Sequence, residues 1–294
     1  MKIYDTFIFG SDLDMLECRL RELDQSPVYR HVIVEAPFTH QGQPKPLCYA
    51  ENAERFAPWK DRITHVVAEV PGPSKYLDPW IREHAQRSYV YQGLKDAEPE
   101  DIVWLCDVDE IPSQRMWTHE PFTMTAWNMR LAMFAVDWVY PEPTRIAISG
   151  RFFHCTNLGR QRDNGYRGGL PLAEDAGWHF TWLGGPDGIR AKLRQQCHLE
   201  LAALIEQGLE NKFWWERGLT WHGQAIYPPQ LTRLHQQLPA VVDETWPVYI
   251  RDRLCPPEWF RPHACSACGT LFTQADGGCR ECCDPVWPEH QGSV

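Results

Sequence analysis

Two aspartates, Asp107 and Asp109, directly follow an apolar run at residues 102–106, and their type and spacing are suited to binding a metal ion. A fully buried strand of a parallel sheet has a continuous hydrophobic sequence, and ligands of open α/β sheets bind beyond the carboxyl ends of such strands. Side chains two residues apart in an extended chain point the same way, so both carboxylates can face one site. Mg²⁺ and Mn²⁺ commonly bind one or two carboxylates together with substrate phosphate oxygens. The pattern predicts a divalent cation that joins the protein to a diphosphate.

The same spacing occurs at Asp12 and Asp14, where we expect a different role. These residues precede apolar positions at helical spacing, so Ser11 or Asp12 is expected to cap a helix. For Asp107 and Asp109 the alternative is a solvated turn before Pro112. The spacing alone leaves both interpretations open.

A second candidate metal site lies at the C-terminus, in two Cys-x2-Cys pairs separated by ten residues: Cys265, Cys268, Cys279 and Cys282. Four thiolates at this spacing satisfy a tetrahedral Zn²⁺ and leave no open position, so the ion is expected to be structural. A tail of about 40 residues buries too little apolar surface to fold without a bound metal ion or another cross-link. Two disulfides are the alternative, but they require an oxidising compartment that nothing else in the sequence supports. We predict a zinc-ribbon module at residues 251–294.

The composition restricts the partners. The 294 residues carry a formal net charge of −10, which disfavours nucleic acid as a partner because its phosphates would be repelled. The N-terminus lacks the apolar core of a signal peptide, and no run approaches the ~18 apolar residues of a membrane span. We therefore expect a cytoplasmic protein without an integral membrane segment.

Apolar, β-rich runs alternate with helical patterns through the first half of the chain. Strands are expected at residues 3–9, 31–36, 63–70 and 102–106, and Asp78 and Pro79 are expected to start a helix as its N-cap and first helical residue. This alternation predicts an α/β fold, a Rossmann-like, mainly parallel sheet with helices on both faces, over residues 1–250. Residues 154–177 contain several glycines and arginines, which indicates a mobile loop whose arginines could bind phosphate; an ordinary surface loop is the alternative.

Six segments follow one another along the chain: residues 4–9 (YDTFIF), 12–23 (DLDMLECRLREL), 32–36 (VIVEA), 42–47 (GQPKPL), 107–112 (DVDEIP) and 177–180 (GWHF). Together they resemble glycosyltransferase family 17. The resemblance extends from the N-terminus to about residue 240, and the ordered series is more specific than any single segment.

The resemblance implies a GT-A type fold, a UDP-sugar donor with N-acetylglucosamine as the expected sugar, a glycan or other hydroxyl acceptor, and inversion at the anomeric carbon. Asp107 and Asp109 then match the family's motif for Mn²⁺ or Mg²⁺ and the diphosphate. His179 is a candidate third ligand, although a packed histidine between two aromatic residues is the alternative. For the donor, Glu35 could accept hydrogen bonds from ribose or uracil, and Arg87 could pair with phosphate unless it forms an ordinary ion pair with Glu83.

An inverting displacement also needs a general base for the acceptor hydroxyl. Asp175 is the first candidate by position, followed by Glu174 and Glu110. Two other classes of function stay open. A sugar-phosphate nucleotidyltransferase would normally show a glycine-rich phosphate loop after the first strand, where this chain has one glycine, Gly10. A non-catalytic sugar-nucleotide-binding protein, with the zinc ribbon as its interaction module, would not need Asp107 or Asp109.

Overall fold

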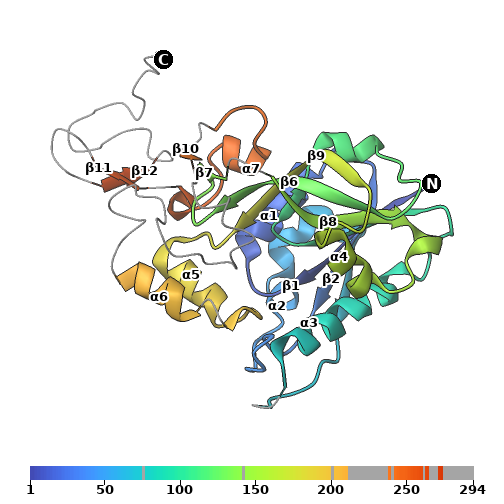
Figure 1. Ribbon diagram of the computed structural model, residues 1–294, viewed down its shortest axis with the longest axis horizontal. Helices are drawn as coiled ribbons and strands as arrows, with labels where there is room; N and C mark the ends of the chain where they lie inside the picture. The colour runs from blue at the N-terminus through green and yellow to red at the C-terminus, as the bar shows by residue number, and fades with distance from the viewer. Residues whose placement is uncertain are drawn as a thin grey trace.

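The predicted alternation of strands and helices is present in the computed structural model (Figure 1). It describes residues 1–74, 77–140, 143–199, 202–210, 238–239, 242–260, 262–264 and 271–273. The elements are β1 (Ile3–Phe9), α1 (Leu13–Glu22), β2 (Val28–Glu35), α2 (Cys48–Glu51), β3 (Ile63–Val67), α3 (Pro79–Ser88), β4 (Ile102–Asp107), β5 (Glu110–Pro112), β6 (Thr125–Met133), β7 (Trp138–Val139), β8 (Thr144–Arg151), α4 (Leu158–Tyr166), β9 (Leu172–Thr181), α5 (Gly185–Leu193), α6 (Ala202–Glu210), β10 (Leu238–Pro239), α7 (Val248–Arg251), β11 (Pro262–Ala264) and β12 (Leu271–Thr273).

The four strands predicted in the first half are confirmed and form a parallel unit. β1 lies between β2 and β4, and β3 pairs with the outer side of β2, giving the order β4-β1-β2-β3. The predicted helix starts are also confirmed. The Asp12 carboxylate accepts a hydrogen bond from the Met15 amide at 2.9 Å, and Asp78 accepts one from the Trp80 amide at 3.0 Å.

The rest of the sheet differs from the prediction, which had the whole sheet mainly parallel. β8 pairs antiparallel with β4, and β6 pairs antiparallel with β8. β9 runs parallel to β6 and also pairs antiparallel with the short strand β5, so the ten-stranded sheet is mixed. The apolar patterns of these later strands indicate that they are strands but not their direction, which depends on how the connections run.

Alternate residues of β1 and β4 pack into two cores on opposite faces of the parallel unit. On one face Phe7 and Trp104 pack with α1 and the 3-10 helix Ala53–Arg62. On the other face Tyr4 and Leu105 pack with the 3-10 helix Tyr89–Leu94 and with the start of α4. Helices therefore cover both faces of this unit, as predicted for an α/β fold.

The loop predicted at residues 154–177 is wrong over half of its length. Residues 158–166 form α4, and its N-cap Asn157 accepts a hydrogen bond from the Arg160 amide at 3.1 Å. Leu158, Arg162 and Gly165 are the buried positions of this helix, a spacing of four and three residues that lies on one helical face. Burial of that face stabilises the helix against its two internal glycines.

The chain packs continuously across residue 250, where the sequence predicted a domain boundary. Trp246, Tyr249, Trp259 and Phe260 belong to one buried cluster with Met15 of α1 and with residues of β5 and β9. The four cysteines of the predicted zinc ribbon lie outside the described residues. Within the described part of the chain, helices are all too short or too polar to cross a membrane.

Candidate active site

The carboxyl ends of β1 and β4 define the place where a ligand is expected to bind this sheet. From β1 the chain proceeds to β2 on one side, whereas β4 lies on the other side of β1. Such a reversal of strand order opens a crevice at the carboxyl ends of the two strands, and open α/β sheets bind ligands there. Asp107 is the last residue of β4, so the predicted motif lies at this crevice.

A tight turn from Asp107 to Glu110 carries the motif and is held on several sides. The Glu110 carboxylate accepts a hydrogen bond from the Asp107 amide at 2.7 Å. The buried Arg19 guanidinium donates to the carbonyl oxygens of Asp107 at 3.2 Å and Glu110 at 2.5 Å. The Phe180 amide of β9 donates to the Asp109 carbonyl at 2.8 Å. These bonds fix the backbone that positions both aspartates.

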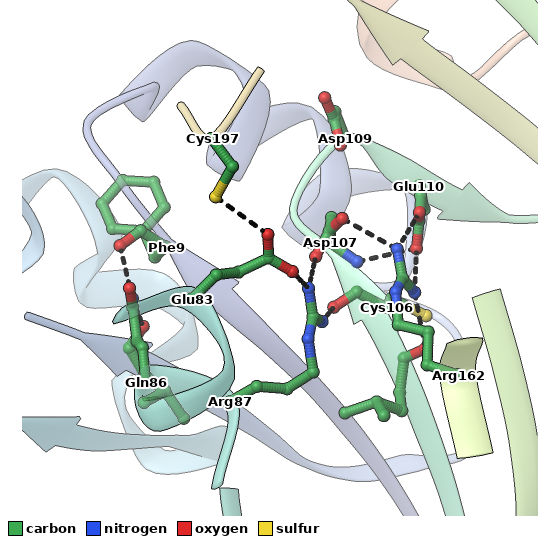
Figure 2. Close-up of polar contacts among 12 residues, drawn as sticks. Phe9, Glu83, Gln86, Arg87, Cys106, Asp107, Asp109, Glu110, Arg162 and Cys197 are labelled. Atoms are coloured by element: carbon green, nitrogen blue, oxygen red, sulfur yellow. Dashed lines mark hydrogen bonds and ion pairs between the residues drawn. The ribbon is translucent and has the colours of Figure 1, made fainter. Parts of the chain in front are cut away.

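Two arginines hold the Asp107 carboxylate (Figure 2). Arg87 of α3 contacts Oδ1 at 2.9 Å and Arg162 of α4 contacts Oδ2 at 2.8 Å. Arg87 also pairs with Glu83 at 2.7 Å, and Arg162 also pairs with the fully buried Glu110 at 2.5 Å. Burial alone would raise the pKa of Asp107, but the two guanidinium groups outweigh burial and hold this pKa well below its usual range. Asp107 is therefore ionised at neutral pH.

Asp109 has different partners. Its Oδ2 lies 2.7 Å from Lys192 Nζ of α5, and its Oδ1 lies 3.9 Å from His179 Nε2 of β9. Two atoms bonded to one Mg²⁺ or Mn²⁺ at about 2.1 Å lie between about 3.0 Å and 4.2 Å apart in octahedral coordination, and the Asp109–His179 separation lies within this range. Asp107 does not join them: in the described part of the chain, the three residues do not bring one donor atom each within 4.8 Å of one another. The extended arrangement expected for Asp107 and Asp109 is replaced by a turn.

The described site thus carries opposite charges in near balance. Its carboxylates are Glu83, Asp107, Asp109 and Glu110, and its cationic side chains are Arg87, Arg162 and Lys192. The excess is one negative charge. An arrangement of this kind can accept a divalent cation at the carboxylates and an anionic group at the lysine.

The sequence of the chain matches the model of glycosyltransferase family 17 over residues 1–183. That region contains β1 to β9 and every residue of the turn described above. The chain belongs to glycosyltransferase family 17.

Curated relatives of this family 17 chain include the beta-1,4-mannosyl-glycoprotein 4-beta-N-acetylglucosaminyltransferases of rat and human. They are 26% and 27% identical to it over 232 residues, which is 65% of this chain and 42% of each relative. The chain therefore spans less than half the length of these relatives.

Two solved structures show partial similarity to this chain. A 4-diphosphocytidyl-2C-methyl-D-erythritol synthase is 11% identical, with a TM-score of 0.33 over 60% of this chain and 89% of that chain. A putative glucose-1-phosphate thymidylyltransferase from Bacillus anthracis is 12% identical, with a TM-score of 0.34 over 69% of this chain and 94% of that chain. Scores this low do not establish a shared fold.

Glu35 lies at the end of β2, but its carboxylate faces the interior of this family 17 chain. It is fully buried, and it accepts hydrogen bonds from the Tyr49 amide at 3.2 Å and from Lys45 Nζ at 3.4 Å. His65 Nε2 lies 3.1 Å from its other oxygen. Its observed role is to join β2 to the segment that follows, so the structure does not place it where ribose or uracil could contact it.

The three candidate bases each have another partner in the protein. Glu110 is fully buried and bonded to Arg162. Asp175 lies where β9 shifts its register against β6, with a φ of +52°, and its side chain is 76% exposed beside Arg115. Glu174 bonds Asn128 of β6. In the described part of the chain, none of the three carboxylates forms a hydrogen bond with Asp109 or His179, and the base stays a prediction.

Sequence reasoning did not single out two cationic residues of the site, Arg162 and Lys192, or the buried Arg19 that holds the backbone of the turn. Arg19 carried a usable signal, because it shares the helical face of Leu16 and Leu20, where a charged residue implies a buried partner. Arg162 was noted only as one of several arginines in a predicted loop. Lys192 had no sequence signal that distinguishes it from a surface lysine.

Proposed function

We propose that this chain is a metal-dependent, inverting glycosyltransferase of GT-A type that moves N-acetylglucosamine from UDP-N-acetylglucosamine to a glycan hydroxyl. The names of the curated relatives support the sugar and the acceptor class. The observation that carries the proposal is the position of the Asp107–Glu110 turn at the crevice between β1 and β4, where a nucleotide diphosphate is expected.

Asp109 and His179 are the proposed ligands for Mn²⁺ or Mg²⁺, because their donor atoms are 3.9 Å apart, Asp109 in the turn after β4 and His179 on β9. A divalent cation at this place would stabilise the negative charge of the departing diphosphate. Lys192 is the proposed phosphate ligand. Its ammonium group lies 2.7 Å from Asp109 and 2.8 Å from the Thr181 hydroxyl, so a phosphate bound at the metal site could accept a hydrogen bond from it.

Asp107 is proposed to position the donor rather than to ligate the ion directly. Arg87 and Arg162 occupy both of its carboxylate oxygens, yet the side chain remains one-third exposed. A carboxylate held in one orientation can accept a hydrogen bond from a ribose hydroxyl or from metal-bound water. The two arginines therefore act through Asp107, because they hold its carboxylate in one orientation.

The proposal is tested by following UDP release from UDP-N-acetylglucosamine with Mn²⁺, with and without a glycan acceptor. Asp109→Asn should lower turnover at least about 100-fold, since a metal ion supplies several kcal/mol of charge stabilisation. Asp175→Asn is the matched control, because its side chain is exposed and pairs with Arg115 instead of Lys192 or His179, and it should keep turnover within about twofold. Equal loss in both variants, or full activity of Asp109→Asn, contradicts the proposed site.

Replacing the substrates separates the alternative functions. UTP with N-acetylglucosamine 1-phosphate should yield no pyrophosphate if the protein is a glycosyltransferase. A panel of UDP-sugars should raise the thermal stability only for the correct donor, because a ligand that binds the native state alone stabilises it. Pyrophosphate release would instead indicate a nucleotidyltransferase, and stabilisation without turnover would indicate a binding protein.

A further inference from the structure

His40, Glu83 and Cys197 come from three separate segments and meet beside the Asp107 site. Each contributes one donor atom to a cluster whose atoms all lie within 4.8 Å of one another. Cys197 Sγ is 3.3 Å from His40 Nδ1 and 3.1 Å from Glu83 Oε2. Figure 2 shows the Cys197 thiol directed at Glu83, whose other oxygen pairs with Arg87.

A buried glutamine determines which nitrogen of His40 carries hydrogen. The Gln86 amide nitrogen donates to the carbonyls of Phe9 at 3.1 Å and Val34 at 2.7 Å, so its oxygen is the atom that faces His40. That oxygen lies 3.1 Å from His40 Nε2. Because the oxygen can only accept, Nε2 must be the protonated nitrogen, and the lone pair of Nδ1 points towards Cys197.

The hydrogen-bond count in this cluster does not close when His40 is neutral and Glu83 is ionised. Nδ1 of His40, the thiol of Cys197 and Oε2 of Glu83 share a single hydrogen, that of the thiol. The thiol can donate to the nitrogen or to the carboxylate, but not to both. One acceptor in a largely buried place is therefore left facing another lone pair, which is unfavourable.

We propose that His40, Glu83 and Cys197 bind a zinc ion. The set of one nitrogen, one oxygen and one sulfur donor suits Zn²⁺, whereas Mg²⁺ and Mn²⁺ prefer oxygen donors alone. Bond lengths of about 2.0–2.3 Å and tetrahedral angles separate such donors by about 3.6 Å, so the observed 3.1 and 3.3 Å need to open by only a few tenths of an ångström. On binding, the thiol loses its proton to solvent and the thiolate bonds to the ion. A water molecule would complete four-coordination.

The surroundings are already arranged for this role. The contact from His40 Nε2 to Gln86 is the kind of outer hydrogen bond that orients metal-bound histidines. The loop that carries His40 is fastened to the segment that carries Cys197, since the His40 amide donates to the Gln195 carbonyl at 3.0 Å and Gln41 donates to the Leu193 carbonyl at 2.5 Å. Little chain entropy therefore remains to be lost on binding.

The proposed zinc would connect two elements that carry cationic residues of the active site. It would join α3 to the segment that follows α5. Arg87 lies on α3, and Lys192 lies on α5 itself. These two cationic residues contact Asp107 and Asp109 respectively. The zinc proposal does not rest on the proposed function, because zinc content can be measured without any assay of transfer.

The test separates this zinc from the one predicted at the C-terminal cysteines. In the full chain carrying Cys265→Ser and Cys268→Ser, one tightly bound zinc should remain after dialysis, and adding Cys197→Ala should remove it. Cys155→Ala is the matched control, since this buried thiol bonds only a backbone carbonyl in the described structure, and it should retain the zinc. No zinc in the double variant, or zinc that persists after Cys197→Ala, overturns the proposal.

A spectroscopic measurement keeps the test decisive if Cys197→Ala fails to fold. X-ray absorption at the zinc edge of the Cys265→Ser, Cys268→Ser chain should show one sulfur at about 2.3 Å and nitrogen or oxygen neighbours at about 2.0–2.2 Å. Replacement of the zinc by Co²⁺ should add a thiolate charge-transfer band. A zinc shell without sulfur overturns the assignment.

Discussion

Lys192 Nζ lies 2.7 Å from Asp109 Oδ2, although 83 positions separate the two residues in the sequence. We expect Lys192→Met to lower turnover about tenfold or more, because Asp109 loses its cation and a bound phosphate loses a donor. Steady-state kinetics with varied donor concentration measure the effect. Arg190→Gln on the same helix is the control, since Arg190 pairs with Glu206 instead, and a comparable loss there would contradict a specific role for Lys192.

Arg162→Met should lower the free energy of unfolding by about 3–5 kcal/mol, because it leaves the Glu110 charge buried without its partner. Urea unfolding at neutral pH measures this change. Arg162→Lys should recover little of it, since an ammonium group cannot form the paired contacts that this guanidinium makes with Asp107 and Glu110.

Arg160→Ala serves as the control for Arg162, because it lies on the exposed side of the same helix. It should change stability by less than about 0.5 kcal/mol. A small effect of Arg162→Met, comparable with that of Arg160→Ala, would show that the buried pair contributes little.

The buried Asp5 should make stability depend on acid pH. Burial alone would raise its pKa, but Arg19 and His31 outweigh burial and lower it from 3.8 to about 2. A carboxyl group with a lowered native pKa stabilises the fold fully above its unfolded pKa, and this contribution is lost as pH falls through the native value. We expect about 2 kcal/mol to disappear between about pH 4 and pH 2.

Comparing wild type with Asp5→Asn isolates that contribution. The difference in their free energies of unfolding should shrink as pH falls from 5 to 2, because the asparagine does not titrate. Denaturant unfolding at several pH values measures it. A difference that stays constant over this range would contradict the assignment to Asp5.

Gly177→Ala should disturb the pairing of β5 with β9. Gly177 has φ +141°, and an added Cβ would lie 2.1 Å from the Ile111 carbonyl oxygen. We expect a loss of at least about 2 kcal/mol of stability and, because His179 lies two residues further on, a loss of turnover. Gly159→Ala is the control: nothing lies within 4 Å of its added Cβ in α4, so this variant should gain about 0.5–1 kcal/mol in thermal unfolding.

Local signals predicted the parallel half of the fold well. The β-rich runs at residues 3–9 and 102–106 form β1 and β4, and the caps Asp12 and Asp78 start α1 and α3. Each of these features depends on residues within a few positions of one another. The loop expected at residues 154–177 was wrong because its glycines argued against a helix, whereas burial of Leu158 and Arg162 favours one.

The sequence by itself determined that Asp107 and Asp109 follow a buried strand and that the chain resembles glycosyltransferase family 17, a membership that the comparison over residues 1–183 shows. Only the tertiary structure decided that Asp107 lies between Arg87 and Arg162, whereas Asp109 lies near His179 and Lys192. The physical reason is the separation of the interacting residues along the sequence. Apolar runs and helix caps are encoded by neighbouring residues, but the partners of a charge are set by how distant helices and strands pack together.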